Sequence, residues 1–230
     1  MLDLLAVGDV MLDVHAPAPS GERLHAPIRV RAGGSAVNVA LAAAELGARA
    51  GVAGCVGDDV AGRAIAEELA RHGVDAHLSP AAAATGTTVY IGLSVVADRG
   101  ANAVFAPMTL PAARVTLFSG YLSPGQLAAV LPLAHGTRAV DLQGNHHDLP
   151  HVDVVLGPEI DIDAWEADVV VSTLGAEGAV ATGGVRAAPP AVVADRRGAG
   201  DRFAAAFLLA FGELPLEEAL RRACAFAAAH

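Results

Sequence analysis

The feature that most constrains the fold is the alternation of short apolar runs with amphipathic stretches along the whole chain. Runs such as residues 52–56 and 152–156 are typical of strands that are buried on both faces. Between such runs, apolar residues recur at helical spacing, as at Val37, Leu41 and Ala44. Strands that alternate with helices predict βαβ units and a largely parallel sheet.

The same pattern gives approximate bounds for the elements. Expected strands cover residues 4–10, 52–56, 74–78, 115–118, 138–142, 152–156 and 168–172. Expected helices cover residues 33–46, 59–73, 124–134 and 200–211, and a last helix begins at Pro215. Residues 179–187 indicate a hairpin around Gly183-Gly184, and residues 87–105 a second one that turns at residues 98–100. Residues 14–31 are either a loop or strands that leave the main sheet and return.

Length and charge limit the classes of function. A chain of 230 residues fits one α/β domain with a small lid and needs no disulfides, and Cys55 and Cys224 have no metal-binding spacing. With 15 basic and 25 acidic residues the net charge is −10, which disfavours nucleic acid and anionic membranes as partners. We see neither a basic leader nor a membrane-spanning run of apolar residues, and therefore expect a cytoplasmic protein.

The strongest candidate site is the run from Asp195 to Phe203, which contains Gly198, Ala199, Gly200 and Asp201. The run joins an expected strand to an expected helix, so glycine would let backbone amides converge on an anion at the positive end of the helix dipole. A carboxylate in the first helical turn could accept the proton of a hydroxyl that attacks a phosphate. A purely structural glycine turn explains the local sequence equally well.

Three other segments carry polar groups next to expected strand ends. Gly33 and Gly34 open a helix in which Asn38 offers both a donor and an acceptor, although a structural glycine turn also explains them. Asp9 and Asp13 follow the first strand, where open α/β sheets bind ligands. The loop of residues 173–178, with Thr173, Gly175 and Gly178, could lie against a flat base, or could be only a turn.

A cluster of metal ligands is a weaker alternative. Asp141, His146, His147, Asp148 and His151 are close in sequence and could bind zinc. They include no helical pair of histidines four residues apart and no cysteine, which disfavours a zinc site.

Taken in order, these motifs resemble those of the ribokinase-like carbohydrate kinase family of phosphofructokinase-B type. The resemblance spans nearly the whole chain: Gly8-Asp9, the Gly-Gly-x-x-x-Asn-x-Ala of residues 33–40, Gly57-Asp58-Asp59-x-x-Gly62, the loop of residues 173–178, and Asp195-x-x-Gly-Ala-Gly-Asp201. It implies a three-layer α/β/α sandwich with a mostly parallel central sheet and a small β lid. Residues 14–31 and 87–105 would form this lid, which in relatives often mediates dimers.

The resemblance also implies transfer of the ATP γ-phosphate to a sugar hydroxyl. Asp201 would be the base, and the amides of Gly198, Ala199 and Gly200 would hold the phosphate. The expected acceptor pocket is lined by Asp9, Asp13, Gly33, Gly34 and Asn38. Thr173, Gly175, Gly178 and Arg197 would flank the nucleotide. Glu159, Asp161 and Asp195 are the candidates for Mg²⁺, and a monovalent cation such as K⁺ is a further candidate cofactor.

The chain departs from the family pattern in two motifs. The usual Asn-x-x-Glu becomes Pro158-Glu159-Ile160-Asp161, and the usual Asp-Thr-Thr-Gly becomes Asp195-Arg196-Arg197-Gly198. These changes, together with the chain end at His230, keep a non-catalytic sugar- or nucleotide-binding relative as an alternative. A nucleoside kinase is another alternative, disfavoured by an aromatic content of only 4%.

Overall fold

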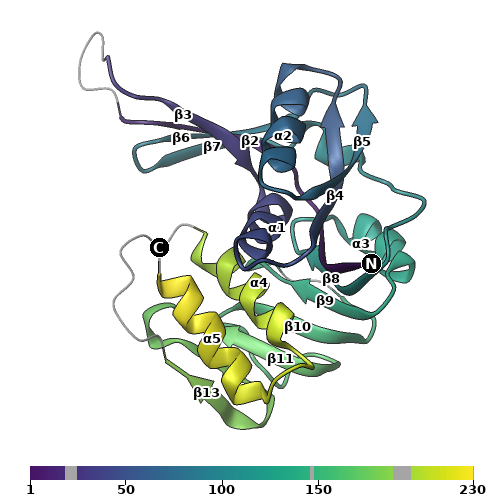
Figure 1. The fold of residues 1–230 in the computed structure, drawn as a ribbon, viewed down its shortest axis with the longest axis vertical. Coiled ribbons are helices and arrows are strands. Elements are labelled where there is room, and N and C mark those ends of the chain that lie inside the picture. Colours follow the sequence, from purple (N-terminus) through teal and green to yellow (C-terminus); the bar gives the residue numbers. More distant parts are fainter. Residues whose placement is uncertain (19–24, 146–147, 189–197, 230) are drawn as a thin grey trace.

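In the computed structural model, residues 1–18, 25–145, 148–188 and 198–229 are described. They form a large sheet of nine strands in the order β13-β12-β11-β10-β9-β8-β1-β4-β5, which runs through the body of the molecule (Figure 1). Neighbouring strands from β5 across to β11 pair in parallel, whereas β12 and β13 join the edge antiparallel. Its strands are β1 (Leu2–Val7), β4 (Ala50–Gly57), β5 (Asp75–Ala81), β8 (Ala113–Ser119), β9 (Thr137–Asp141), β10 (Val152–Pro158), β11 (Ala167–Thr173), β12 (Ala179–Ala181) and β13 (Val185–Ala187).

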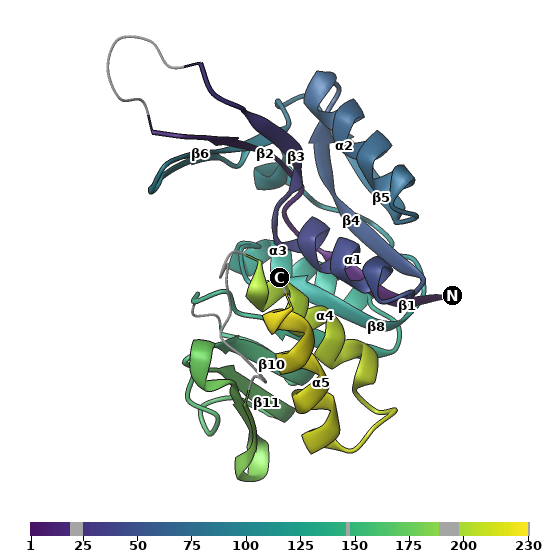
Figure 2. The ribbon, with the colours of Figure 1, turned by 60° about the vertical axis from the view of Figure 1, so that its left-hand side comes forward.

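Helices cover both faces of this sheet. Side chains alternate between the two faces of a strand, so Leu4 packs on one side and Leu5 on the other. The helices α1, α4 and α5 lie together on one face (Figure 2), and α2 contributes to the same core. The helix α3 packs on the opposite face with the 3-10 segments η1 (Gly100–Val104) and η2 (Leu131–Leu133). The α-helices are α1 (Ser35–Glu45), α2 (Val60–Arg71), α3 (Pro124–Val130), α4 (Ala199–Ala210) and α5 (Leu216–Ala228). The expected three-layer α/β/α fold is therefore confirmed.

A second sheet of four strands projects from the body in the order β3-β2-β6-β7 (Figure 1). Its strands are β2 (Met11–Ala16), β3 (Arg29–Gly33), β6 (Gly86–Ile91) and β7 (Ser94–Asp98). The strands β2 and β6 pair in parallel, although their paired residues, such as Met11 and Gly86, are 75 positions apart in the sequence. Residues 14–31 were interpreted either as a loop or as strands that leave the main sheet and return. In the described part of that segment, the second interpretation is correct.

Local sequence signals place most of the helix ends. Asp59 caps α2 by accepting a hydrogen bond from the Gly62 amide at 2.8 Å. Ser123 begins α3 with a capping box, in which the backbone amide of Gln126 donates a hydrogen bond to the Ser123 hydroxyl. After α1, Gly47 adopts a φ of +83°, a left-handed conformation that glycine enters without strain.

Two sequence predictions were wrong in their bounds. The hairpin expected to turn at residues 98–100 instead turns between Ile91 and Ser94, and residues 100–104 form η1. Asp98 accepts a hydrogen bond from the Gly100 amide, so the polar triplet opens the 3-10 segment and does not close a hairpin. The third helix ends at Val130, four residues early, because Pro132 has no amide to continue the α-helical pattern. Within the described residues, no helix is long and apolar enough to span a membrane.

Candidate active site

Asp201 lies in the first turn of α4, where three side chains donate hydrogen bonds to its carboxylate. Asn38 Nδ2 is 3.0 Å from Asp201 Oδ2, while Ser35 Oγ and Gln143 Nε2 lie 3.3 and 3.4 Å from Oδ1. Gly198 caps the helix with a φ of +75°, and the first amides of any helix lack an intrahelical acceptor. The helix α1 and the end of β9 therefore bring their polar groups to the positive end of α4.

A second carboxylate, Asp141, lies at the end of β9 and is only 6% exposed. Gln143 joins it to Asp201, because the same side-chain nitrogen is 2.7 Å from Asp141 Oδ2 and 3.4 Å from Asp201 Oδ1. The Gln143 backbone amide also donates to Asp141 Oδ1 at 3.3 Å. Asp141 thus belongs to the same polar network as Asp201.

Burial shifts the proton affinity of both carboxyl groups upward. Desolvation raises the pKa of Asp201 from 3.8 to about 6, against the opposing effect of its three donors. Desolvation and the nearby Asp201 charge raise the pKa of Asp141 from 3.8 to about 7. Pairs of titratable groups with such shifts are typical of active sites.

The Gly-Gly turn before α1 is required by close packing. A Cβ atom on Gly33 would collide with the Asp13 carboxylate, and one on Gly34 would collide with the backbone oxygen of Asp9. Gly34 also has a φ of +89°, which side chains rarely adopt. These glycines thus allow the end of β3 to approach Asp9 and Asp13 closely, and they start the helix that carries Asn38.

Asp13 lies on β2 at the base of the small sheet and is 2% exposed. Burial raises the pKa of its carboxyl group, while Arg31 and a hydrogen bond from Thr88 oppose that shift. Arg31 is 3.9 Å away, which is a loose ion pair. Among the described residues, nothing donates a hydrogen bond to Asp13 Oδ1 although that atom is buried. A buried acceptor atom of this kind is suited to a ligand hydroxyl.

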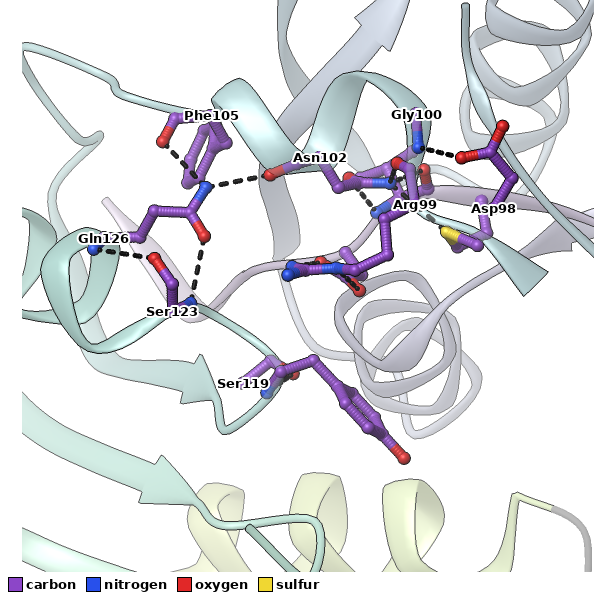
Figure 3. Close-up of polar contacts among 12 residues, drawn as sticks. Asp98, Arg99, Gly100, Asn102, Phe105, Ser119, Ser123 and Gln126 are labelled. Atoms are coloured by element: carbon purple, nitrogen blue, oxygen red, sulfur yellow. Dashed lines mark hydrogen bonds and ion pairs between the residues drawn. The ribbon is translucent and has the colours of Figure 1, made fainter. Parts of the chain in front are cut away.

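Asp9 is engaged by a side chain that the sequence did not suggest. Arg99 donates to both of its oxygens, at 2.7 and 3.3 Å, in a bidentate ion pair. Figure 3 shows Arg99 beside Asn102, whose side chain binds the backbone of Val10 on both its donor and acceptor sides. The side-chain nitrogen of Gln126 in turn donates a hydrogen bond to the backbone carbonyl oxygen of Asn102 (Figure 3). This network fixes the chain that follows β1 to the segment after β7.

Two tyrosines connect the carboxylates electrostatically. Burial raises the pKa of Tyr90, and Asp13 and Asp201 both add to that shift. Burial also raises the pKa of Tyr121, which is influenced by Asp201, Asp141 and Asp9. Each of the four carboxylates is therefore close enough to act electrostatically on at least one of these two tyrosines.

The other predicted residues lie on neighbouring strand ends. Glu159 and Asp161 follow β10 and are exposed, and the Glu159 amide donates to the Thr173 carbonyl oxygen at 3.0 Å. Gly175 and Gly178 have φ values of +58° and +93°, and a Cβ on Gly178 would collide with the Ala187 carbonyl oxygen. This loop is therefore a tight backbone turn beside the end of β10.

Some predicted residues cannot be placed. Asp195 and Arg197 of the site, and His146 and His147 of the alternative zinc cluster, lie outside the described residues. Among the residues that are described, no group of three His, Cys, Asp or Glu side chains could hold a metal ion by itself.

Comparison with known proteins identifies the family of the chain. Residues 1–163 and 160–230 match the family described as pfkB family carbohydrate kinase. The chain belongs to that family. As a member of this kinase family it is expected to act on small molecules.

Solved structures support the fold. The chain is similar to adenosine kinase from Sinorhizobium meliloti, with a TM-score of 0.81 and 22% identity over 98% of this chain and 92% of that one. It is also similar to a ribokinase from Thermotoga maritima, with a TM-score of 0.84, 18% identity and coverages of 99% and 92%. For ribokinase from Arabidopsis thaliana complexed with ribose and ATP, the TM-score is 0.76 at 24% identity, with coverages of 99% and 91%. At these identities the likeness establishes the fold, which sugar and nucleoside kinases share.

Proposed function

We propose that this protein transfers the γ-phosphate of ATP to a hydroxyl group of a small sugar or sugar derivative, with Asp201 as the general base. The observation that carries the proposal is the Asp201 carboxylate itself. It lies at the start of α4, accepts three hydrogen bonds, and has a pKa raised to about 6. Such a group is ionised at neutral pH and still basic enough to take a proton from an attacking hydroxyl.

The acceptor is proposed to bind between the small sheet and α1. Asp13 offers a buried oxygen without a partner among the described residues, and Asn38 already contacts the base. Gly33 packs directly against the Asp13 carboxylate, and Gly34 starts the helix that carries Asn38. Asp9 is proposed to contribute to this pocket by holding Arg99 in place through their bidentate ion pair. We propose that the small sheet, which includes residues 14–31 in part and 87–98, closes over the acceptor as a lid and can mediate a homodimer.

The nucleotide is proposed to lie across the start of α4. Backbone amides of Gly198, Ala199 and Gly200 would hold the transferred phosphate, as helix N-termini commonly do. The turn formed by Thr173, Gly175 and Gly178 would lie against the base, and Arg197 would contact the phosphates.

Two exposed carboxylates fit a Mg²⁺ ion that arrives with the nucleotide. Magnesium in such sites needs only one or two carboxylates in addition to phosphates and water, and Glu159 and Asp161 supply two beside the proposed nucleotide loop. When bound, the ion would neutralise charge on the phosphates. Asp195 is a third proposed ligand and K⁺ a proposed further cofactor.

A nucleoside acceptor is the second candidate. It is favoured by the exposed ring of Tyr121, which Asp201, Asp141 and Asp9 influence electrostatically, because aromatic rings are common stacking partners for bases. ATP turnover across a panel of sugars and nucleosides would separate the two candidates. If wild type binds a panel compound but turns over none of them, the kinase proposal fails and a binding role takes its place.

A further inference from the structure

Gln143 has an unusual backbone conformation and a side chain shared by several partners. Its φ is +52°, a left-handed backbone conformation that non-glycine residues rarely adopt. Its single side-chain nitrogen lies within 2.7 Å of Asp141, 3.1 Å of Ser35 and 3.4 Å of Asp201. The strained conformation thus places one amide between two carboxylates.

The two carboxylates are not in equivalent surroundings. Asp201 accepts hydrogen bonds from Asn38, Ser35 and Gln143, and lies at the positive end of a helix dipole. Asp141 is the more buried group and accepts hydrogen bonds only from Gln143 among the described residues. The hydrogen-bond donors and the helix dipole both stabilise a negative charge, so Asp201 is the carboxyl group that ionises first.

Among the described residues, the other charged or titratable groups that act on the pair do not reverse this difference. Arg31 favours the ionised form of Asp201. Burial and the charges of Asp201, Asp141 and Asp9 raise the pKa of Tyr121 above 10, so Tyr121 remains neutral near pH 7. Two buried carboxylates joined by one amide cannot both ionise without repulsion.

We infer that Asp141 retains a proton when Asp201 is ionised, and that Gln143 is the positioning residue that couples these two carboxyl groups. The proton comes from solvent and stays on an Asp141 oxygen, so no bond other than O–H forms or breaks. The direction agrees with the higher pKa of Asp141, about 7 against about 6 for Asp201. Only the kinetic consequence rests on the proposed function: ionisation of Asp141 would add a negative charge where the nucleotide phosphates must approach.

The first test measures protonation and needs no turnover. Protein labelled with ¹³C at aspartate carboxyl carbons is titrated by NMR, and the Asp141 signal is assigned with Asp141→Asn. In Asp201→Asn the neighbouring charge is gone, so the proton affinity of Asp141 is expected to fall about tenfold or more. An unchanged titration of Asp141 would overturn the inference.

The role of Gln143 is tested by a matched pair of variants. Gln143→Leu removes the shared donor and is expected to raise the proton affinity of both carboxyl groups several-fold. Gln126→Leu makes the same chemical change at a glutamine whose side chain, within the described part of the chain, bonds to backbone atoms of Ser123, Asn102 and Phe105, and it leaves both titrations unchanged. Gln143→Gly is the second variant, because glycine tolerates a positive φ and should fold without added strain. If both Gln143 variants titrate like wild type, Gln143 does not couple the pair.

The second test uses the pH dependence of kcat/KM. Wild type is expected to lose activity below about pH 6 and again above about pH 7. Asp141→Asn imitates the protonated acid, so it keeps the acidic limb and loses the alkaline one. If Asp141→Asn retains the alkaline loss, the inference is wrong even though the kinase proposal survives. If no compound is turned over, the proposed function fails and the NMR titration still decides the inference.

Discussion

The stability of Asp141→Asn relative to wild type should increase as the pH rises. The pKa of this buried carboxyl group is raised in the folded state, so folding favours the protonated form. Its contribution to stability is complete below pH 3.8 and is lost progressively as pH rises through about 7. Each pKa unit corresponds to 1.36 kcal/mol, so between pH 5 and pH 8 the folded wild type loses about 3 kcal/mol from this one group. An asparagine cannot ionise and is spared that loss.

Urea unfolding at pH 5 and pH 8 measures the effect directly. The stability of Asp141→Asn relative to wild type is expected to increase by about 3 kcal/mol from the lower to the higher pH. Asn145→Ala serves as the control because Asn145 is exposed and the change removes no ionisable group, so its stability relative to wild type should be the same at both pH values. If the Asp141→Asn difference is equally independent of pH, the carboxyl group does not titrate as the structure requires.

Three further substitutions test polar contacts that hold the fold together. Asn102→Leu removes the bonds to both backbone groups of Val10 and should lower the free energy of unfolding by about 3 kcal/mol, whereas Asn145→Leu on the surface should change it little. Asp59→Ala removes the cap of α2 together with two hydrogen bonds from Thr85, so it should lower the free energy of unfolding by about 2 kcal/mol or more; an unchanged Tm would contradict these roles. Arg99→Ala leaves Asp9 buried and unpaired, so it should cost about 3 kcal/mol, and Asp9→Asn in the same chain should recover part of that loss. Additive effects in this double-mutant cycle would show that the pair is not coupled.

Most of the main sheet could be predicted because its strands are continuous apolar runs separated by helices with clear caps. Asp59 and Ser123 are examples in which one polar side chain and its spacing identify a helix start. The small sheet was harder. Most of residues 87–97 are apolar or β-branched, and Leu93 is fully exposed at the true turn, so hydrophobicity did not indicate where the hairpin reverses. Gly92, with a φ of +59°, was the available turn signal.

The candidate site was predicted in its glycines and in Asp201, but only half of its polar network was found. Asp141 entered the sequence argument only as a metal ligand, and Gln143 and Arg99 were not singled out as site residues. Gln143 contacts Ser35 and Asp201 across 108 and 58 positions of sequence, and Arg99 reaches Asp9 across 90. Such partners are set by strand order, which periodicity does not specify. One available signal was the position of Asp141 at the carboxyl end of an expected buried strand.

The central claim, that Asp201 is the general base of a kinase, is tested most directly by comparing wild type with Asp201→Asn on an acceptor found in the panel. Acceptor affinity is measured by calorimetry and phosphoryl transfer by single-turnover kinetics. We expect the transfer rate of Asp201→Asn to fall by about 10² to 10⁴-fold while the acceptor Kd changes by no more than about threefold. Transfer at the wild-type rate, or a loss explained entirely by weaker binding of the acceptor, would contradict the assignment of Asp201 as the base.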